Sequence, residues 1–253
     1  MTPILAILLT VGGLSSYAVP MNVLVFSRTT GFRHDSIPAG ITCLKTMAER
    51  NGWGITCTED PAAFSDAALA RFDVTVWLMT TGDVLDAAQE KAFARFIRSG
   101  KGFVGVHSAT ITETDWPWFV DLVGAKFIGH PPDQKGRLVV EDRDHPSIPT
   151  AMPNAWTRDD EWYSFDRNPR GKVRVLASID ESSYDVDDNQ WFPGIKQRMG
   201  DHPLVWCHEY DGGRAFQTAM GHTVESYADP IFVAHVEGAI LWAAGPKERE
   251  KNR

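Results

Sequence analysis

Short apolar segments alternate with amphipathic, helix-like segments along the first half of the chain, and this alternation restricts the fold more than any other feature. In the segment 86–99, Phe93, Phe96 and Ile97 recur at i, i+3 and i+4 and so share one helix face. Strands that alternate with helices predict a mostly parallel sheet covered by helices on both faces, which is a three-layer α/β arrangement. The strand-like segments are 22–27, 53–57, 73–79 and 102–107, and the helix-like segments are 37–51, 63–71 and 86–99.

The sequence after Phe127 is interrupted by prolines and is richer in strand-like segments. The turn residues Asp211, Gly212 and Gly213 separate the last two of these segments. No linker rich in Gly, Ser or Pro divides the two halves, so we expect the strand-rich second half to extend the same sheet. The segments with β character are 137–141, 173–179, 204–208 and 214–219, and a final helix is expected at 228–244.

Both ends of the chain are expected to lie outside the folded domain. An apolar run at residues 3–17, followed by the small side chain of Ala18, is typical of a cleaved leader and predicts a periplasmic or secreted protein. No basic residue precedes the run, however, and Met21 stands directly before the first strand, so a cytoplasmic protein that starts at Met21 is the alternative. We therefore assign residues 1–20 to a signal peptide or a mis-assigned start, 21–245 to the domain and 246–253 to a charged tail.

Composition argues against several kinds of partner. The chain has 25 Lys and Arg against 33 Asp and Glu, a net charge of −8, and it lacks the basic clusters that bind nucleic-acid phosphates. No segment beyond residue 20 has the run of about eighteen apolar residues that would give a stable membrane span. Cys43, Cys57 and Cys207 form no C-x-x-C pair, so we expect unpaired packing residues. The oligomeric state stays open, a homo-oligomer included.

Residues 100–105 match the glycine spacing of a dinucleotide-binding fingerprint. They read Gly-Lys-Gly-Phe-Val-Gly. A dinucleotide fingerprint follows a strand and opens a helix, whereas these glycines end a helix and begin a strand. Because the context is reversed, we expect neither NAD nor flavin to bind.

Three histidines stand at strand ends. His34 follows the first strand, His107 ends the fourth, and His222 follows the last. Since the carboxyl ends of parallel strands meet at one edge of a sheet, where ligands bind, these imidazoles are expected to converge. Glu161 lies in a segment with carboxylates and aromatic residues and is the expected acid–base partner. The histidines could hold a divalent metal such as zinc, or the four residues could shuttle protons as catalytic groups, and spacing alone does not decide between them.

Five motifs in sequence order resemble those of the ThuA-like (trehalose utilisation) family, and the resemblance extends from Met21 to Gly245. The resemblance implies a fold similar to that of class I glutamine amidotransferases, a flavodoxin-like architecture, and a role in carbohydrate metabolism. It also implies a small-molecule carbohydrate as the ligand, with oxidised 3-keto sugars or glycosides as one substrate class. The motifs are GFRHDSI at 31–37, GVHSA at 105–109, DHP at 144–146, DEWY at 160–163, and a stretch at 213–222 that begins GRAF and ends GH.

One departure from the amidotransferase pattern restricts the chemistry. Those enzymes carry a cysteine nucleophile at the turn after a central strand, and here His107 stands at that turn. Without the thiolate that forms the acyl intermediate, the chain is not expected to be a glutaminase. Ser108 is also a poor nucleophile candidate, because G-x-S-x-G is not matched and adjacent residues of an extended segment face opposite sides.

The sequence therefore predicts a sugar-processing enzyme, which would be a hydrolase, a lyase or an isomerase. Arg33, Trp162 and Tyr163 are the expected substrate-binding residues, since aromatic faces pack on the C–H surfaces of sugar rings and planar donors bind hydroxyls. Two alternatives stay open. One is a sugar-binding protein without catalysis, and the other is a metal-dependent hydrolase of an unrelated substrate.

Overall fold

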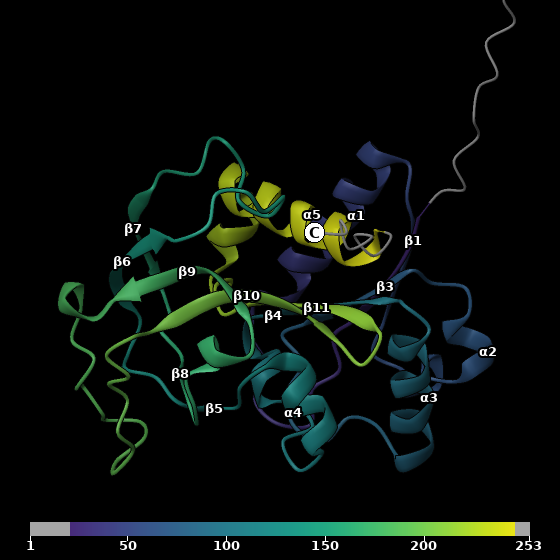
Figure 1. Ribbon diagram of the computed structural model, residues 1–253, viewed down its shortest axis with the longest axis horizontal. Helices are drawn as coiled ribbons and strands as arrows, with labels where there is room; N and C mark the ends of the chain where they lie inside the picture. The colour runs from purple at the N-terminus through teal and green to yellow at the C-terminus, as the bar shows by residue number, and fades with distance from the viewer. Residues whose placement is uncertain (1–20, 246–253) are drawn as a thin grey trace, which may run out of the picture.

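A mixed sheet of nine strands runs through the middle of the molecule (Figure 1). The computed structural model describes residues 21–245, so the expected leader at 1–20 and the charged tail at 246–253 lie outside the described residues. The strands of this sheet are β1 (Asn22–Phe26), β2 (Gly54–Thr58), β3 (Val74–Leu78), β4 (Gly102–Val106), β6 (Gln134–Val140), β7 (Ala155–Asp160), β9 (Arg174–Asp180), β10 (Pro203–Tyr210) and β11 (Gly213–Thr218). Their order is β2-β1-β3-β4-β11-β10-β9-β6-β7.

The two halves of the sheet differ in strand direction. β2, β1, β3, β4 and β11 are parallel to their neighbours within this group. From β11 outward, β10, β9, β6 and β7 pair antiparallel. The expectation that the strand-rich second half extends the same sheet is therefore confirmed.

Helices cover both faces of the parallel half, as a three-layer α/β fold requires (Figure 1). Alternation along β1 divides the core: Val23 and Val25 pack in one apolar cluster with residues of α1 and α5, while Leu24 and Phe26 pack in a second cluster with residues of α3 and α4. The helices are α1 (Ile37–Asn51), α2 (Asp66–Leu69), α3 (Ala87–Arg98), α4 (Pro117–Val123) and α5 (Pro230–Ala244).

Local chemistry sets the helix boundaries. The side chain of Asp86 accepts hydrogen bonds from the backbone N–H groups of Ala88 and Gln89, and Gln89 closes a capping box that starts α3. The predicted face of Phe93, Phe96 and Ile97 is buried in one core cluster. The glycines at 100–105 do end a helix and begin a strand, as predicted.

Several short elements were not predicted. β7 was missed because its sequence, AWTRDD, is polar, as befits a strand at the sheet edge. The helix expected at 63–71 is divided, because Ser65 caps a new helix, α2. Among the helices of the described residues, none combines the length and apolar character needed to cross a membrane. The remaining elements are β5 (Phe127–Gly129) and β8 (Ser164–Phe165), which pair with each other, and the 3₁₀ helices η1 (Pro61–Ala63), η2 (His107–Ile111), η3 (Pro169–Gly171), η4 (Glu181–Ser183) and η5 (Val224–Ala228).

Candidate active site at the carboxyl edge of the sheet

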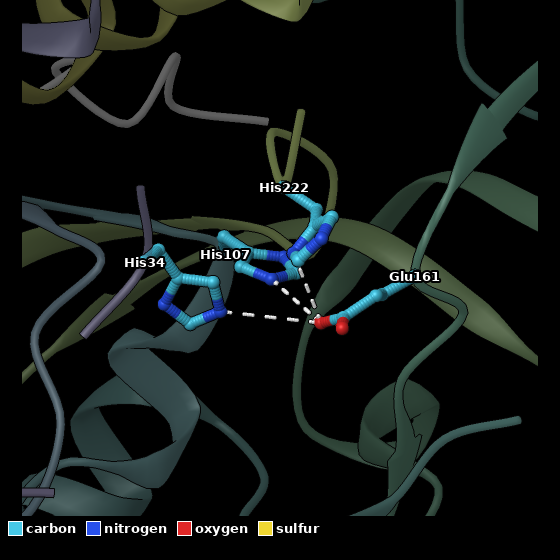
Figure 2. A group of neighbouring side chains, drawn as sticks. All are labelled: His34, His107, Glu161 and His222. Atoms are coloured by element: carbon cyan, nitrogen blue, oxygen red, sulfur yellow. Dashed lines mark hydrogen bonds and ion pairs between the residues drawn. The ribbon is translucent and has the colours of Figure 1, made fainter. Parts of the chain in front are cut away.

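The three histidines that follow strands come together at the carboxyl edge of the parallel strands (Figure 2). His34 lies in the loop between β1 and α1, His107 directly follows β4, and His222 lies in the loop after β11. Their ring centroids are 4.8 Å apart for His34 and His107, 5.4 Å for His34 and His222, and 5.3 Å for His107 and His222. His34 and His107 are buried, and His222 is partly exposed.

His107 stands on a sharp turn that glutamine and glycine hold in place. Its φ is +54°, in the left-handed region that side chains with a Cβ rarely adopt. The buried Gln217 amide donates to the His107 carbonyl at 3.1 Å. At Gly105, a Cβ would lie 2.0 Å from the Gln217 side-chain oxygen, so only glycine leaves room for this brace. Residues His107–Ile111 form the 3₁₀ helix η2, so the expectation that Ser108 lies in an extended segment is wrong. The Ser108 hydroxyl is buried and has no hydrogen-bond partner among the described residues.

The carboxylate of Glu161 lies at the centre of the cluster. Its Oε2 is 3.2 Å from His107 Nε2, 3.2 Å from His222 Nδ1 and 3.9 Å from His34 Nε2. The preceding residue, Asp160, ends β7 and is fully buried. Asp160 accepts hydrogen bonds from the backbone N–H groups of Gly221 and His222, so the end of β7 holds the loop that carries His222.

The hydrogen bonds of His107 define what its second nitrogen can do. Nδ1 lies 2.8 Å from the carbonyl oxygen of Ala219, which can only accept, so Nδ1 carries a proton. In the neutral ring, Nε2 then presents a lone pair to the Glu161 carboxylate. A lone pair facing an anion is favourable only when a proton or a cation lies between them. The same requirement makes this arrangement suited to proton transfer or to cation binding.

The environment shifts the pKa values of the cluster in opposite directions. Burial lowers the pKa of His34 to about 4, which favours a neutral imidazole. Burial also opposes the charge on His222, but the nearby Glu161 carboxylate outweighs it and raises the pKa of His222. For Glu161, burial would raise the pKa, yet the imidazoles of His107, His222 and His34 lower it well below its usual range. A carboxylate and a neutral imidazole therefore lie side by side.

Two cavities open beside this cluster. The larger, of about 530 Å³, has walls of Phe32, Phe127, Tyr163, Trp191 and Phe192, and we call it the aromatic cavity. The smaller, of about 270 Å³, is lined by Asp35, Ser36, Asp133, His222 and Thr223 together with Val224, and we call it the polar cavity. Phe32 and His34 line both. A further hollow of about 580 Å³ along α1 and η5 contains none of the clustered residues, so we place the site at the two cavities.

The structure separates the expected substrate-binding residues. Tyr163 lines the aromatic cavity, with its ring centroid 4.3 Å from that of His107. Trp162 is fully buried and its indole N–H donates to the carbonyl of Gln134, so the expectation that Trp162 contacts a substrate does not fit its position. Arg33 is half exposed and pairs with Glu59 at 2.7 Å, and it lines neither cavity.

His130 is a member of the site that the sequence analysis missed. Its Nε2 is 3.6 Å from Glu161 Oε1, and its Nδ1 lies 2.8 Å from the carbonyl oxygen of Pro131. It lines the aromatic cavity beside Tyr163. The signal was weak, because His130 follows β5, a strand of only three residues.

Comparison with known proteins agrees with the architecture. Among solved structures, the fold is similar to that of a ThuA-like protein from Bacteroides uniformis, with 24% sequence identity, a TM-score of 0.72, and coverage of 92% of this chain and 95% of the other. It is also similar to that of a ThuA-like protein from Parabacteroides merdae, with 20% identity, a TM-score of 0.68, and coverage of 91% of this chain and 92% of the other. A β-galactosidase from Bacillus circulans shares the fold over 90% of this chain but 31% of its own length, with 12% identity and a TM-score of 0.55. No curated protein gives a significant sequence match.

The family comparison settles the relationship that the motifs indicated. The model of the family described as ThuA, trehalose utilisation, matches residues 22–243, which is nearly the whole length of the described structure. The chain therefore belongs to the ThuA family, which is associated with trehalose utilisation and carbohydrate metabolism.

Proposed function

We propose that this protein is an enzyme that processes a sugar or glycoside, with a 3-keto glycoside as one candidate substrate. The observation that carries this proposal is the convergence of three imidazoles on one buried carboxylate beside two cavities. Buried charged and titratable groups are costly to a fold and concentrate where chemistry is done. The carbohydrate substrate rests on the family, whose association is with trehalose utilisation.

The donor set also suits a divalent cation such as zinc. One ligand atom each from His34, His107, Glu161 and His222 lies within 4.8 Å of the others. Ligands about 2.0–2.1 Å from a tetrahedral zinc ion lie roughly 3.3 Å apart. The separations of 3.2 and 3.9 Å measured from Glu161 Oε2 are close to that value. The Ala219 carbonyl supports this use of His107, because metal-binding imidazoles commonly donate their second N–H to such a group.

The neighbouring side chains supply proton transfer whether or not a cation is bound. A bound divalent cation would polarise a substrate oxygen. His130 donates from Nδ1 to the Pro131 carbonyl, so the lone pair of Nε2, 3.6 Å from Glu161 Oε1, can accept a proton from a substrate that reaches the cluster. Burial raises the pKa of Tyr163 well above its usual value, so its hydroxyl stays a donor for a developing oxyanion.

Turnover of paired substrates tests the proposal. The purified protein is incubated with methyl glucoside, trehalose and their 3-keto derivatives, and the products are followed by mass spectrometry. We expect conversion of at least one sugar. Saturable binding of these sugars without any conversion would instead indicate a sugar-binding protein. Absence of both would argue for a hydrolase of unrelated substrates, for which elemental analysis is the first measurement.

A further inference from the structure

The two cavities that meet at the cluster differ in the share of their walls that can form hydrogen bonds. The aromatic cavity takes polar groups from His34, His130 and Glu161, from the Tyr163 hydroxyl and from the Trp191 indole N–H, but most of its wall is aromatic or aliphatic carbon. The polar cavity presents carboxylate and hydroxyl side chains, among them Asp133, whose Oδ2 is 3.3 Å from His222 Nε2. Glu161 of the first cavity and His222 of the second are in contact at 3.2 Å. One ligand that reaches both cavities would therefore pass the cluster at its middle.

Two of the aromatic side chains that line the aromatic cavity are unusually exposed. Phe32 is 70% exposed and Trp191 is 52% exposed. Among residues 21–245, these are the exposed aromatic side chains, and both line this one cavity. Exposed apolar surface along a cavity marks a binding site, because water leaves that surface when a ligand covers it.

For the size of its walls, the aromatic cavity offers a sugar ring few hydrogen-bond partners. A sugar carries hydroxyl groups around its ring, and a hydroxyl buried without a hydrogen-bond partner costs free energy. The walls formed by Phe127 and Phe192 provide no such partners from their side chains, and Trp191 provides only its indole N–H. The polar cavity does, because Asp35, Asp133 and Thr223 can accept or donate hydrogen bonds.

We infer that the substrate is a glycoside with a flat, apolar aglycone, whose sugar occupies the polar cavity and whose aglycone occupies the aromatic cavity. The bond between the two parts lies beside His34 and Glu161. Phe32 lines both cavities and therefore borders this junction. The inference rests on the proposed function and names the class of glycoside that the same site takes.

The test compares two ligands that differ only in the aglycone. Binding of 4-nitrophenyl β-glucoside and methyl β-glucoside, and of their 3-keto forms, is measured by isothermal titration calorimetry with the full chain. We expect the nitrophenyl compound to bind at least about tenfold more tightly, in keeping with the stacking of one buried aromatic ring. Trp191→Ala should weaken binding of the nitrophenyl compound far more than binding of the methyl compound and so remove most of this difference. Leu241→Ala, at an exposed position on α5 away from both cavities, is the matched control.

The outcomes separate this inference from the function on which it rests. Equal affinities for the two aglycones, with binding retained, would overturn the inference and leave the proposed function in place. A nitrophenyl preference that survives in Trp191→Ala and in Phe192→Ala would overturn the assignment of the aglycone to the aromatic cavity. Failure of every glucoside to bind would count against the proposed function, and this inference would fall with it.

Discussion

At the residue scale, His107 is held in a conformation that glycine would adopt more easily. The φ of His107 is +54°, and a residue that has a Cβ loses free energy in this conformation. Such strain persists only where the surrounding structure enforces it. Gln217 and the Ala219 carbonyl supply that enforcement by binding the backbone and the ring of His107. In this enforced conformation, the Nε2 atom of His107 points towards the Glu161 carboxylate.

The strain makes His107→Gly an informative variant. Glycine relieves the left-handed backbone, while loss of the ring removes packing against Tyr163, so we expect the free energy of unfolding to change by no more than about 1–2 kcal/mol. Turnover should fall by at least about a hundredfold, because the group that transfers protons or binds a cation is gone. Urea denaturation and initial rates measure the two effects. The histidine control is His208→Gln, in β10 outside the cluster, and a fully active His107→Gly would exclude His107 from the chemistry.

If the cluster binds a cation, the metal content of the purified protein should depend on the Glu161 carboxylate. We expect the native protein to hold about one zinc or similar divalent ion per chain, and Glu161→Gln to lose most of it, because a neutral amide is a much weaker ligand than a carboxylate. Mass spectrometry of the purified proteins for metals measures this. Glu237→Gln is the matched control, since Glu237 is also a largely buried carboxylate with a charged partner, Arg50, but lies on α5 outside the cluster. A native protein without metal would leave acid–base chemistry as the role of these residues.

The sequence predicted the clustered residues better than it predicted the cavity walls. His34, His107 and His222 follow buried strands, and the carboxyl ends of these strands meet at one edge of the sheet. Trp162 lies in the core, whereas its neighbour Tyr163 lines the aromatic cavity. The difference arises because the direction of each side chain depends on the exact course of the chain after β7. Trp191 lies in a loop without periodicity, so no pattern could place it.

At the scale of elements, the long apolar strands and α1 and α3 were predicted to within a residue or two. Such segments bury one or both faces, and their periodicity records that burial in the sequence. The elements missed were β5, β7, β8 and α4, which are short or polar. β7 is the important omission, because it is a polar edge strand whose position is set by pairing with β6 and whose end carries Glu161.

The link between β7 and the loop after β11 can be tested at Asp160. Asp160 accepts two backbone N–H groups of that loop and lies 3.2 Å from Arg158. Asp160→Asn removes the charge that pairs with a largely buried arginine, so we expect a loss of about 2–4 kcal/mol in the free energy of unfolding. Because His222 is then less well held, turnover should also fall under conditions where the variant is folded. The control Asp159→Asn, at an exposed position of the same strand, should change neither quantity.

At the scale of the whole molecule, the site exists only where the two parts of the sheet meet. The parallel part supplies His34, His107 and His222, and the antiparallel part supplies Glu161. The aromatic cavity is likewise closed by the long segment between β9 and β10, which carries Trp191. We therefore expect the activity of the protein to fall when the contacts that join this segment to the sheet are weakened.

Glu181 and His202 form that junction. One oxygen of the Glu181 carboxylate accepts a hydrogen bond from Met199 N–H and lies 2.9 Å from His202 Nδ1, and the other accepts from Gly200 N–H. The second ring nitrogen of His202 donates to the carbonyl of Tyr163, which is a cavity residue. A single buried carboxylate thus ties the start of the 181–202 segment to its end and to the wall of the site.

This junction predicts a specific loss of stability in acid. Burial would raise the pKa of Glu181, but hydrogen bonds from His202 and the backbone of Met199 and Gly200 lower it to about 2, from an ordinary value of 4.5. A carboxyl with a lowered pKa stabilises the fold fully above its unfolded pKa, and this contribution, about 3 kcal/mol, is lost as the pH falls from about 5 towards 2. Urea denaturation of the native protein and of Glu181→Gln at pH 7, 5, 4 and 3 measures it. We expect the variant to be less stable at pH 7 and the two curves to converge in acid, whereas a constant difference across this range would exclude Glu181 as the titrating group.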